Sequence, residues 1–189
     1  MLTAIIAIYS VYVLLKMYVS VMQIGYVNQA KRQGAVLMGS ADYLKAGNYS
    51  VAKEKLSMLG TLIDFIVFLA WMRFGIAFIE QHVMVFDPAV STILGVLGFI
   101  LINGLISLPM EYYEKFVLDA KFGFNRSTKA LFIKDTLIST MLTVVFGALV
   151  IWGIYLIISS TALWWLWSFG FIFGVIVLLN MFYPTMRAV

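Results

Sequence analysis

The residues that could perform chemistry in this sequence are few, and the histidine count limits them most. His82 is the single histidine among 189 residues, and cysteine is absent. A catalytic zinc site typically takes two or three histidine or cysteine ligands, and disulfides need cysteine pairs. The sequence therefore predicts no catalytic residue, no metal ligand and no cofactor site within this chain.

Three ionisable residues, Lys16, Asp64 and Arg73, interrupt long apolar runs. A charge within a membrane span is costly, so each is a functional candidate. Asp64 and Arg73 are nine residues apart, about 900° around an α-helix, so they point to opposite faces and cannot pair there. Asp64 could pair with Lys16 across two helices, or Asp64 and Arg73 could line a water-filled chamber. Snorkelling explains Lys16 and Arg73 equally well, and Asn103 suits the chamber or an interhelical hydrogen bond.

The composition places these residues in a membrane protein. Hydrophobic residues make up 63% of the chain and charged residues 12%, against about 45–50% and about 25% in soluble domains. A net charge of +4 without a basic face gives no reason to expect nucleic-acid binding. Five stretches reach the length of about 20 residues that crosses a bilayer: roughly 2–26, 56–79, 89–108, 131–158 and 163–183. We therefore predict an all-α, polytopic membrane bundle of about five transmembrane helices with amphipathic cytoplasmic helices, and the lipid bilayer as its partner.

The connections between these spans indicate an orientation. Lys and Arg are concentrated in residues 27–55 and 109–130, whereas residues 80–88 and 159–162 have none. The positive-inside rule then predicts an outside N-terminus and a cytoplasmic C-terminus, as in a bacterial inner-membrane or endoplasmic-reticulum protein. Residues 36–55 suit a surface helix, broken at Gly47-Asn48, that runs into the second span.

The densest polar stretch is "SLPMEYYEKFVLDAKFGFNRST", residues 107–128. Pro109 suits the first turn of an amphipathic surface helix of about three turns. Gly123 would end this helix in a left-handed turn, and Asn125 would cap the fourth span. The predicted apolar face comprises Tyr112, Tyr113, Phe116, Val117 and Ala120, and the polar face comprises Glu111, Glu114, Lys115 and Lys121, with Leu118 as an exception.

The order of residues in this stretch closely resembles the integral-membrane CAAX prenyl proteases, which are zinc metalloendopeptidases of the gluzincin type. The matching residues are Leu108-Pro109, Tyr112, Phe116-Val117, Asp119, Lys121, Phe122-Gly123-Phe124-Asn125, Thr128, Phe132 and Asp135. The flanks "ADYLKAGNYSVAKEKLSML" (41–59), "LWWLWSF" (163–169) and "LLNMFYPT" (178–185) are also similar to that family. The chain departs from the family pattern at Asp119-Ala120, where the family usually has two adjacent acids.

The resemblance implies a catalytic helix with H-E-x-x-H and a further Glu ligand, which we expect downstream of Val189 rather than in this chain. The expectation is an N-terminal membrane domain that encloses a chamber, is inactive alone and gains zinc only in the full-length protein. Its partners would be its own C-terminal zinc protease domain and a peptide or lipidated-protein substrate. The residues expected to seat that domain are Pro109, Tyr112, Phe116, Asp119, Lys121, Phe122, Gly123, Phe124, Asn125 and Asp135; those expected to line the chamber are Asp64, Arg73 and Asn103.

Two alternatives belong to other function classes. A free-standing transporter or channel subunit would use Asp64, Arg73 and Asn103 along a path. A catalytically dead paralogue would bind protease substrates without cleaving them.

Overall fold

The computed structural model describes residues 2–33 and 39–186, and within these residues every regular element is helical. Five of the described helices are long and apolar enough to cross a membrane: Leu2–Gln33, Ser40–Val83, Pro88–Phe122, Lys129–Ser160 and Trp164–Met181. Each overlaps one of the five predicted spans. The prediction of an all-α membrane protein with about five transmembrane helices is therefore confirmed.

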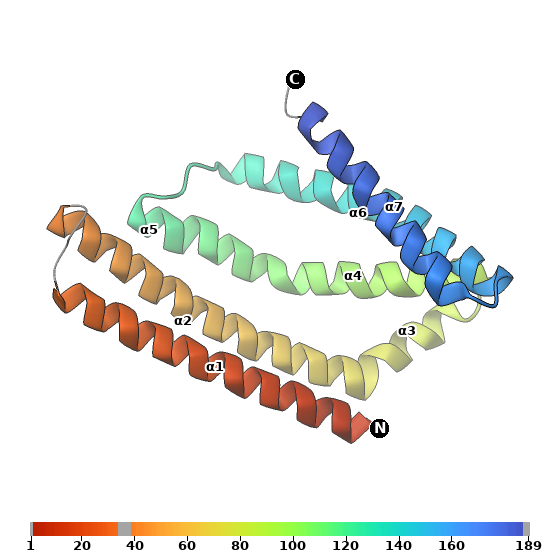
Figure 1. Ribbon diagram of the computed structural model, residues 1–189, viewed down its shortest axis with the longest axis horizontal. Helices are drawn as coiled ribbons and strands as arrows, with labels where there is room; N and C mark the ends of the chain where they lie inside the picture. Colours follow the sequence, from red (N-terminus) through yellow and green to blue (C-terminus); the bar gives the residue numbers. More distant parts are fainter. Residues whose placement is uncertain (1, 34–38, 187–189) are drawn as a thin grey trace. The chain divides into compact units, whose positions relative to one another are not determined.

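The elements are labelled in chain order in Figure 1. They are α1 (Leu2–Gln33), α2 (Ser40–Ala70), the π-helix η1 (Trp71–Gly75), α3 (Ile76–Val83), α4 (Pro88–Tyr113), the π-helix η2 (Glu114–Asp119), α5 (Ala120–Phe122), α6 (Lys129–Ser160) and α7 (Trp164–Met186). They divide into two compact units, described here one at a time. The first unit takes Met1–Phe78 with Gly104–Thr128, and the second takes Ile79–Asn103 with Lys129–Val189.

In the first unit, α1 and α2 run antiparallel and side by side (Figure 1). Tyr9 packs on Phe68 with ring centroids 4.3 Å apart. Near the other end of the pair, the Tyr43 hydroxyl donates to the Ala30 carbonyl at 3.2 Å. The predicted break at Gly47 is wrong, because α2 continues through it. A Cβ at Gly47 would lie 2.6 Å from the Lys31 side chain, so this glycine serves the close approach of α1.

The third long helix differs from the prediction at Pro109. Pro109 lies inside α4, and α4, η2 and α5 form one helix over Pro88–Phe122. The expectation that Pro109 opens a separate surface helix is therefore wrong. A proline lacks the N–H that would bond to the carbonyl four residues earlier, but membrane helices tolerate this because neighbouring groups satisfy the backbone.

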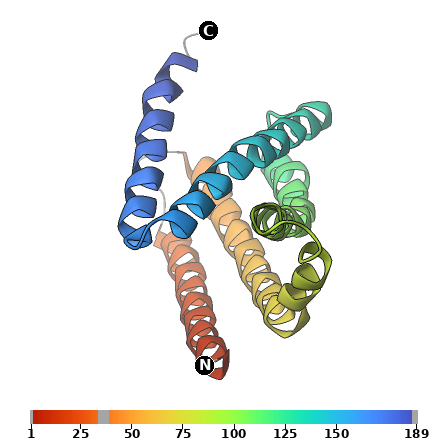
Figure 2. The same ribbon diagram turned by 90° about the vertical axis from the view of Figure 1, so that its right-hand side faces the viewer.

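In the second unit, α6 and α7 meet at the turn of residues 161–163 and diverge from it (Figures 1 and 2). Gly153 of α6 faces Phe171 of α7, and a Cβ at Gly153 would lie 2.7 Å from that ring. The turn before α4 is closed by Asp87, whose carboxylate accepts from the Ala89 amide at 2.9 Å. The Ser91 hydroxyl donates to the Val83 carbonyl at 2.6 Å and ties α3 to α4.

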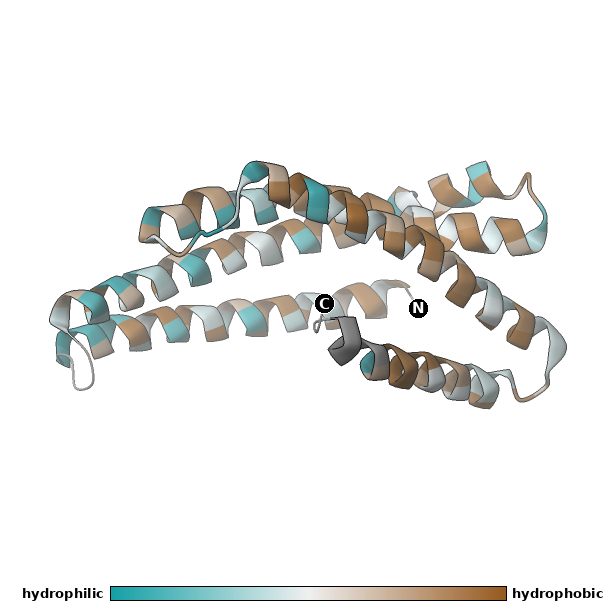
Figure 3. Ribbon diagram, turned by 90° about the horizontal axis from the view of Figure 1, so that it is seen from above, coloured by the Kyte–Doolittle hydropathy of each residue, from teal (hydrophilic) through white to brown (hydrophobic). Residues whose placement is uncertain are grey.

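Hydrophobic side chains cover most of the outer surface of these helices. No residue in the most apolar window of α6 is buried within the described chain. Figure 3 shows polar residues of the first unit gathered near the ends of α1, α2 and α5, with apolar residues along the rest of the helices. Such surfaces are covered by lipid in a membrane protein, and lipid tails supply the apolar contacts that a soluble core would supply.

Candidate functional site

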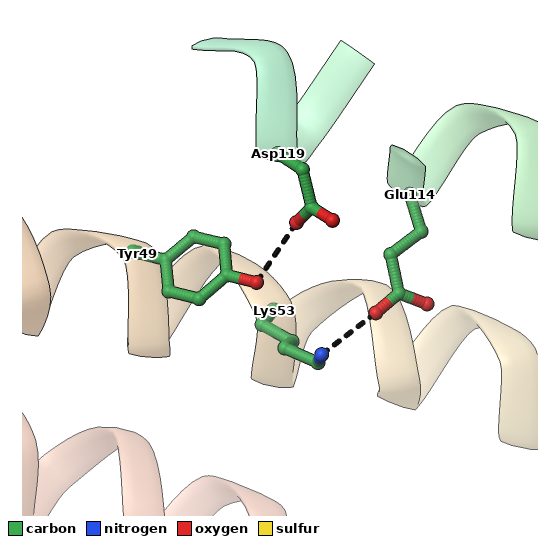
Figure 4. Close-up of polar contacts among 4 residues, drawn as sticks. All are labelled: Tyr49, Lys53, Glu114 and Asp119. Carbon is green, nitrogen blue, oxygen red and sulfur yellow. Dashed lines mark hydrogen bonds and ion pairs between the residues drawn. The ribbon is translucent and has the colours of Figure 1, made fainter. Parts of the chain in front are cut away.

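Two polar contacts join α2 to η2 and are the best-defined feature of the first unit (Figure 4). The Tyr49 hydroxyl donates to an Asp119 carboxylate oxygen at 2.8 Å. One α-helical turn further along α2, the Lys53 ammonium pairs with the Glu114 carboxylate at 2.8 Å. In both contacts the carboxylate belongs to the polar stretch of residues 107–128, and its partner lies on α2.

The π-helical turn explains how these contacts share one register. Tyr49 and Lys53 are four residues apart, so they lie on one face of α2. Glu114 and Asp119 are five residues apart, a spacing that would diverge on an α-helix. In a π-helix the backbone bonds link residues i and i+5, which places residues five apart near one another. The π turn of η2 therefore presents both carboxylates to α2.

This register also decides which face of η2 is buried. Leu118, the exception in the predicted amphipathic pattern, is the buried residue of η2. Tyr113 and Val117, on the predicted apolar face, are 48% and 44% exposed. The segment continues α4 and packs the face with Leu118 against α2, so it does not lie alone on the membrane surface. The exposed Tyr113 and Val117 side chains remain available to lipid.

The polar contacts raise the pKa of two groups in the part of α2 that precedes its apolar run. The hydrogen bond to Asp119, followed by burial and the charge of Asp119, raises the pKa of Tyr49 above its usual 10.0. The hydrogen bond to Glu114 raises the pKa of Lys53 above its usual 10.5. The phenol therefore stays protonated and the ammonium stays charged throughout the neutral range.

Beyond η2 the chain ends its helix as the sequence predicts. Gly123 has φ 75°, its amide donates to the Ala120 carbonyl at 3.1 Å, and the Phe124 amide donates to the Asp119 carbonyl at 2.8 Å. These two bonds form a Schellman motif. Asp119 thus holds Tyr49 with its side chain and the following turn with its backbone.

The turn delivers an aromatic group onto α2. The Tyr49 ring lies 4.7 Å from Phe124 and 5.4 Å from Phe122, centroid to centroid. Lys45 lies over the Phe124 ring at 5.5 Å. Phe124 remains 51% exposed. Its ring is therefore held in place by Tyr49 on one side and is accessible on the other.

A polar cavity of about 290 Å³ lies beside the Lys53–Glu114 pair. Its lining comprises Lys16, Lys53, Leu56, Ser57, Gly60, Thr61, Asp64, Met110 and Glu114, all from the first unit. Lys16 and Asp64 both line this cavity, but no ion pair joins them among the described residues.

The other predicted residues are placed as follows. Arg73 is exposed in η1, and Asn103 donates to the Phe99 carbonyl at 2.7 Å within its own helix. Tyr112 packs on Phe116 with ring centroids 4.8 Å apart. Lys121 lies over the Phe122 ring at 6.0 Å. Pro109 and Asp135 are exposed, and Asp135 lies on α6.

Asn125 does not cap the fourth span as predicted. Its side-chain carbonyl accepts from the Ser127 amide at 2.8 Å, whereas α6 begins at Lys129. This is an Asx turn in the connection before the helix. The short Asn side chain bonds two residues onward, so it closes the connection and not the first turn of α6.

Sequence reasoning missed the roles of Tyr49, Lys53 and Glu114. The sequence predicts Tyr49 and Lys53 on a surface helix over residues 36–55, and Glu114 on the polar face of a second surface helix. The signal that could have found them is their similar spacing. Tyr49 and Lys53 are four residues apart on one helix, and the carboxylates that they contact are five residues apart on the other. The π turn aligns the two pairs, but the residue types of this segment do not predict a π turn.

The described residues of this chain do not fit a zinc site. In residues 2–33 and 39–186 no group of three or more His, Asp or Glu side chains could hold a metal ion. His82 is the single imidazole of the sequence, so the two-histidine helix of a gluzincin cannot be built from it.

Comparison with known proteins adds a family match. Residues 23–188 match the family model described as the CAAX prenyl protease N-terminal, five membrane helices. The CAAX prenyl protease 1 of Saccharomyces cerevisiae is 30% identical over 144 residues, which cover 68% of this chain and 32% of that protein. A CAAX prenyl protease 1 homolog of Dictyostelium discoideum is 35% identical over 85 residues, 44% of this chain and 20% of that protein.

Among solved structures, the crystal structure of S. mikatae Ste24p superposes on this chain with a TM-score of 0.86 at 22% sequence identity. The match covers 97% of this chain and 46% of that chain. At 22% identity, this similarity shows a shared fold and nothing further. The chain spans a third or less of the length of these two curated relatives, and under half of this solved structure.

Proposed function

This chain belongs to the CAAX prenyl protease N-terminal family and is the membrane domain of a protein of that kind; from this premise we propose that it encloses a chamber and seats a catalytic zinc domain. The complete protein would be a zinc metalloendopeptidase that acts on a prenylated or otherwise membrane-borne peptide. This chain would be inactive alone, because its single histidine cannot supply the two zinc ligands of such an enzyme.

The contact of Tyr49 with Asp119 is the observation that carries the seating proposal. Asp119 belongs to the family motif, and its side chain and backbone together fix the helix end that presents Phe122, Gly123 and Phe124. A docking surface must keep its shape before the partner arrives, since ordering it on binding reduces affinity. The exposed ring of Phe124 above this fixed turn supplies an aromatic anchor of the kind that interfaces use.

The chamber proposal draws support from the polar cavity of the first unit. Lys16 and Asp64 contribute charges to a cavity whose helices are otherwise apolar. Charged residues within membrane helices commonly face water-filled spaces. We place the cavity within the wall of the proposed chamber; Arg73 and Asn103 stay candidates for the same wall.

The first test is to read the parent gene past codon 189 and then to assay the full-length protein. We expect H-E-x-x-H with a later Glu, and zinc-dependent cleavage of a prenylated peptide. Tyr49→Phe should reduce cleavage about tenfold or more at unchanged zinc content, because small displacements of a catalytic domain are costly. Tyr113→Phe, an exposed tyrosine without this contact, is the matched control. A stop codon after Val189 would end the protease proposal for this molecule.

The orientation proposal, with the N-terminus outside and the C-terminus cytoplasmic, can be tested by cysteine labelling. The chain has no native cysteine, so single cysteines report without background. Ala41→Cys should react with an impermeant maleimide only from the cytoplasmic side, and Ala162→Cys only from the outside. The reverse pattern would refute this topology.

A further inference from the structure

The charges in the polar cavity of the first unit are unevenly paired. Lys53 and Glu114 form an ion pair at 2.8 Å. Lys16 and Asp64 line the same cavity, yet no ion pair joins them among the described residues. An ionised group in apolar surroundings is strongly disfavoured unless a partner neutralises it. One cation and one carboxylate therefore lack a partner of opposite charge within the described chain.

The two groups lie in helices that are long and apolar enough to cross a membrane. Lys16 is half-buried in the middle of α1, and Asp64 is exposed within the apolar run of α2. The opposing wall is supplied by Met110 of α4. A ligand that reaches this cavity must come through the membrane or its interface, and it must carry charges that match both groups.

We propose that this cavity binds the zwitterionic phosphoethanolamine headgroup of a membrane phospholipid, with its phosphate on Lys16 and its ammonium on Asp64. The cavity carries two cations and two carboxylates, so a ligand without net charge keeps it neutral. A purely anionic headgroup would leave Asp64 unmatched. The volume of about 290 Å³ is at the lower end of small-molecule sites, which suits a headgroup whose acyl chains stay in the bilayer.

The lining also discriminates between two zwitterionic headgroups. A primary ammonium donates hydrogen bonds to a carboxylate, whereas quaternary ammonium groups are bound by aromatic cages. No aromatic side chain is among the residues that line this cavity in the described chain. The walls therefore favour ethanolamine over choline. The same cavity supports the chamber proposal, but headgroup binding needs no protease activity, because Lys16 and Asp64 lie outside the family motif.

The test is a competition on the full chain, purified in detergent, by native mass spectrometry. The protein is offered phosphatidylethanolamine, phosphatidylcholine and phosphatidylglycerol with identical acyl chains. We expect phosphatidylethanolamine to be retained at least about tenfold over the others, and Lys16→Met or Asp64→Asn to abolish the preference. Lys55→Met and Glu80→Gln, which remove exposed charges outside the cavity, should retain it.

Soluble phosphoethanolamine separates the lipid from its headgroup. Displacement of bound phosphatidylethanolamine by this compound, absent in Asp64→Asn, supports recognition of the headgroup in the cavity. Equal retention of the three lipids, or a preference that survives both cavity variants, would overturn headgroup recognition in this cavity. Binding of soluble phosphoethanolamine without retention of the lipid would overturn the lipid as the ligand. Asp64→Asn is nearly isosteric, and an unchanged melting curve shows that the variant is folded.

Discussion

A comparison of the two α2–η2 contacts tests the account of how the family-motif segment is held. Tyr49→Phe removes only the hydroxyl that donates to Asp119. A hydrogen bond to a charged group contributes about 1.5–3 kcal/mol, and partial exposure of both residues puts the expected value at the low end, about 1.5 kcal/mol. The Lys53 and Glu114 side chains are 54% and 38% exposed, so their ion pair should contribute only about 0.2–1 kcal/mol.

Two double-mutant cycles measure these values directly. One combines Tyr49→Phe with Asp119→Ala, and the other combines Lys53→Met with Glu114→Gln; the coupling energy of each pair is its non-additive part. Stability is read from thermal unfolding in detergent. For a chain of this size, 1 kcal/mol corresponds to roughly 2–4 °C in Tm, so Tyr49→Phe alone should lower Tm by about 3–6 °C.

Tyr113→Phe provides the control, because it deletes the same hydroxyl from an exposed tyrosine. The reasoning fails if the Lys53–Glu114 coupling equals or exceeds the Tyr49–Asp119 coupling. It also fails if Tyr49→Phe and Tyr113→Phe have the same effect on Tm.

Three further predictions concern the backbone, helix packing and pH. Gly123→Ala should destabilise the protein by about 1–2 kcal/mol because φ is 75° there. Gly104→Ala, in a helix with open space at its Cβ, should not destabilise it. Equal melting curves for the two variants would contradict this. Gly153→Ala should lower Tm, because its Cβ would lie 2.7 Å from a ring carbon of Phe171 in α7. Replacing Phe171 by a smaller side chain in the same variant should restore Tm. The pKa values of Tyr49 and Lys53 are raised above 10.0 and 10.5, so both contacts stabilise fully from neutral pH to about pH 10 and are lost as pH rises through the raised values. Tm measured from pH 7 to 11 should therefore fall less in a Tyr49→Phe variant.

The sequence predicted the features that follow from a single local cause. Apolar runs of about 20 residues predicted the five membrane helices, since bilayer thickness imposes that length. Gly123 predicted the end of the third helix, because the left-handed turn strongly favours glycine. The motif in residues 108–135 predicted the family, which the match of residues 23–188 confirms.

The features that failed depend on tertiary context. Pro109 was assigned to a helix start from its local preference, yet it lies within α4, where the surrounding membrane helices tolerate it. Leu118 looked like an exception because an α-helical period was assumed, and the π turn moved it to the buried face. Gly47 looked like a break, whereas the approach of Lys31 from α1 explains it. In each case the deciding contact comes from another helix.

The π turn of η2 makes residue number, as well as residue type, a determinant of this site. A π turn holds one more residue than an α-helical turn of the same helix, so it behaves as a single-residue insertion. Deleting one residue between Glu114 and Asp119 would convert the π turn to an α-helical turn and leave the two carboxylates four residues apart, still on one face of the helix. Inserting one further residue would instead rotate Asp119 and everything after it by about 100° relative to Glu114. Tyr49 or Lys53 would then lose its partner, and Phe124 would leave the face of α2. Chimeras and loop grafts across this segment can therefore lose one residue between the two carboxylates but cannot gain one.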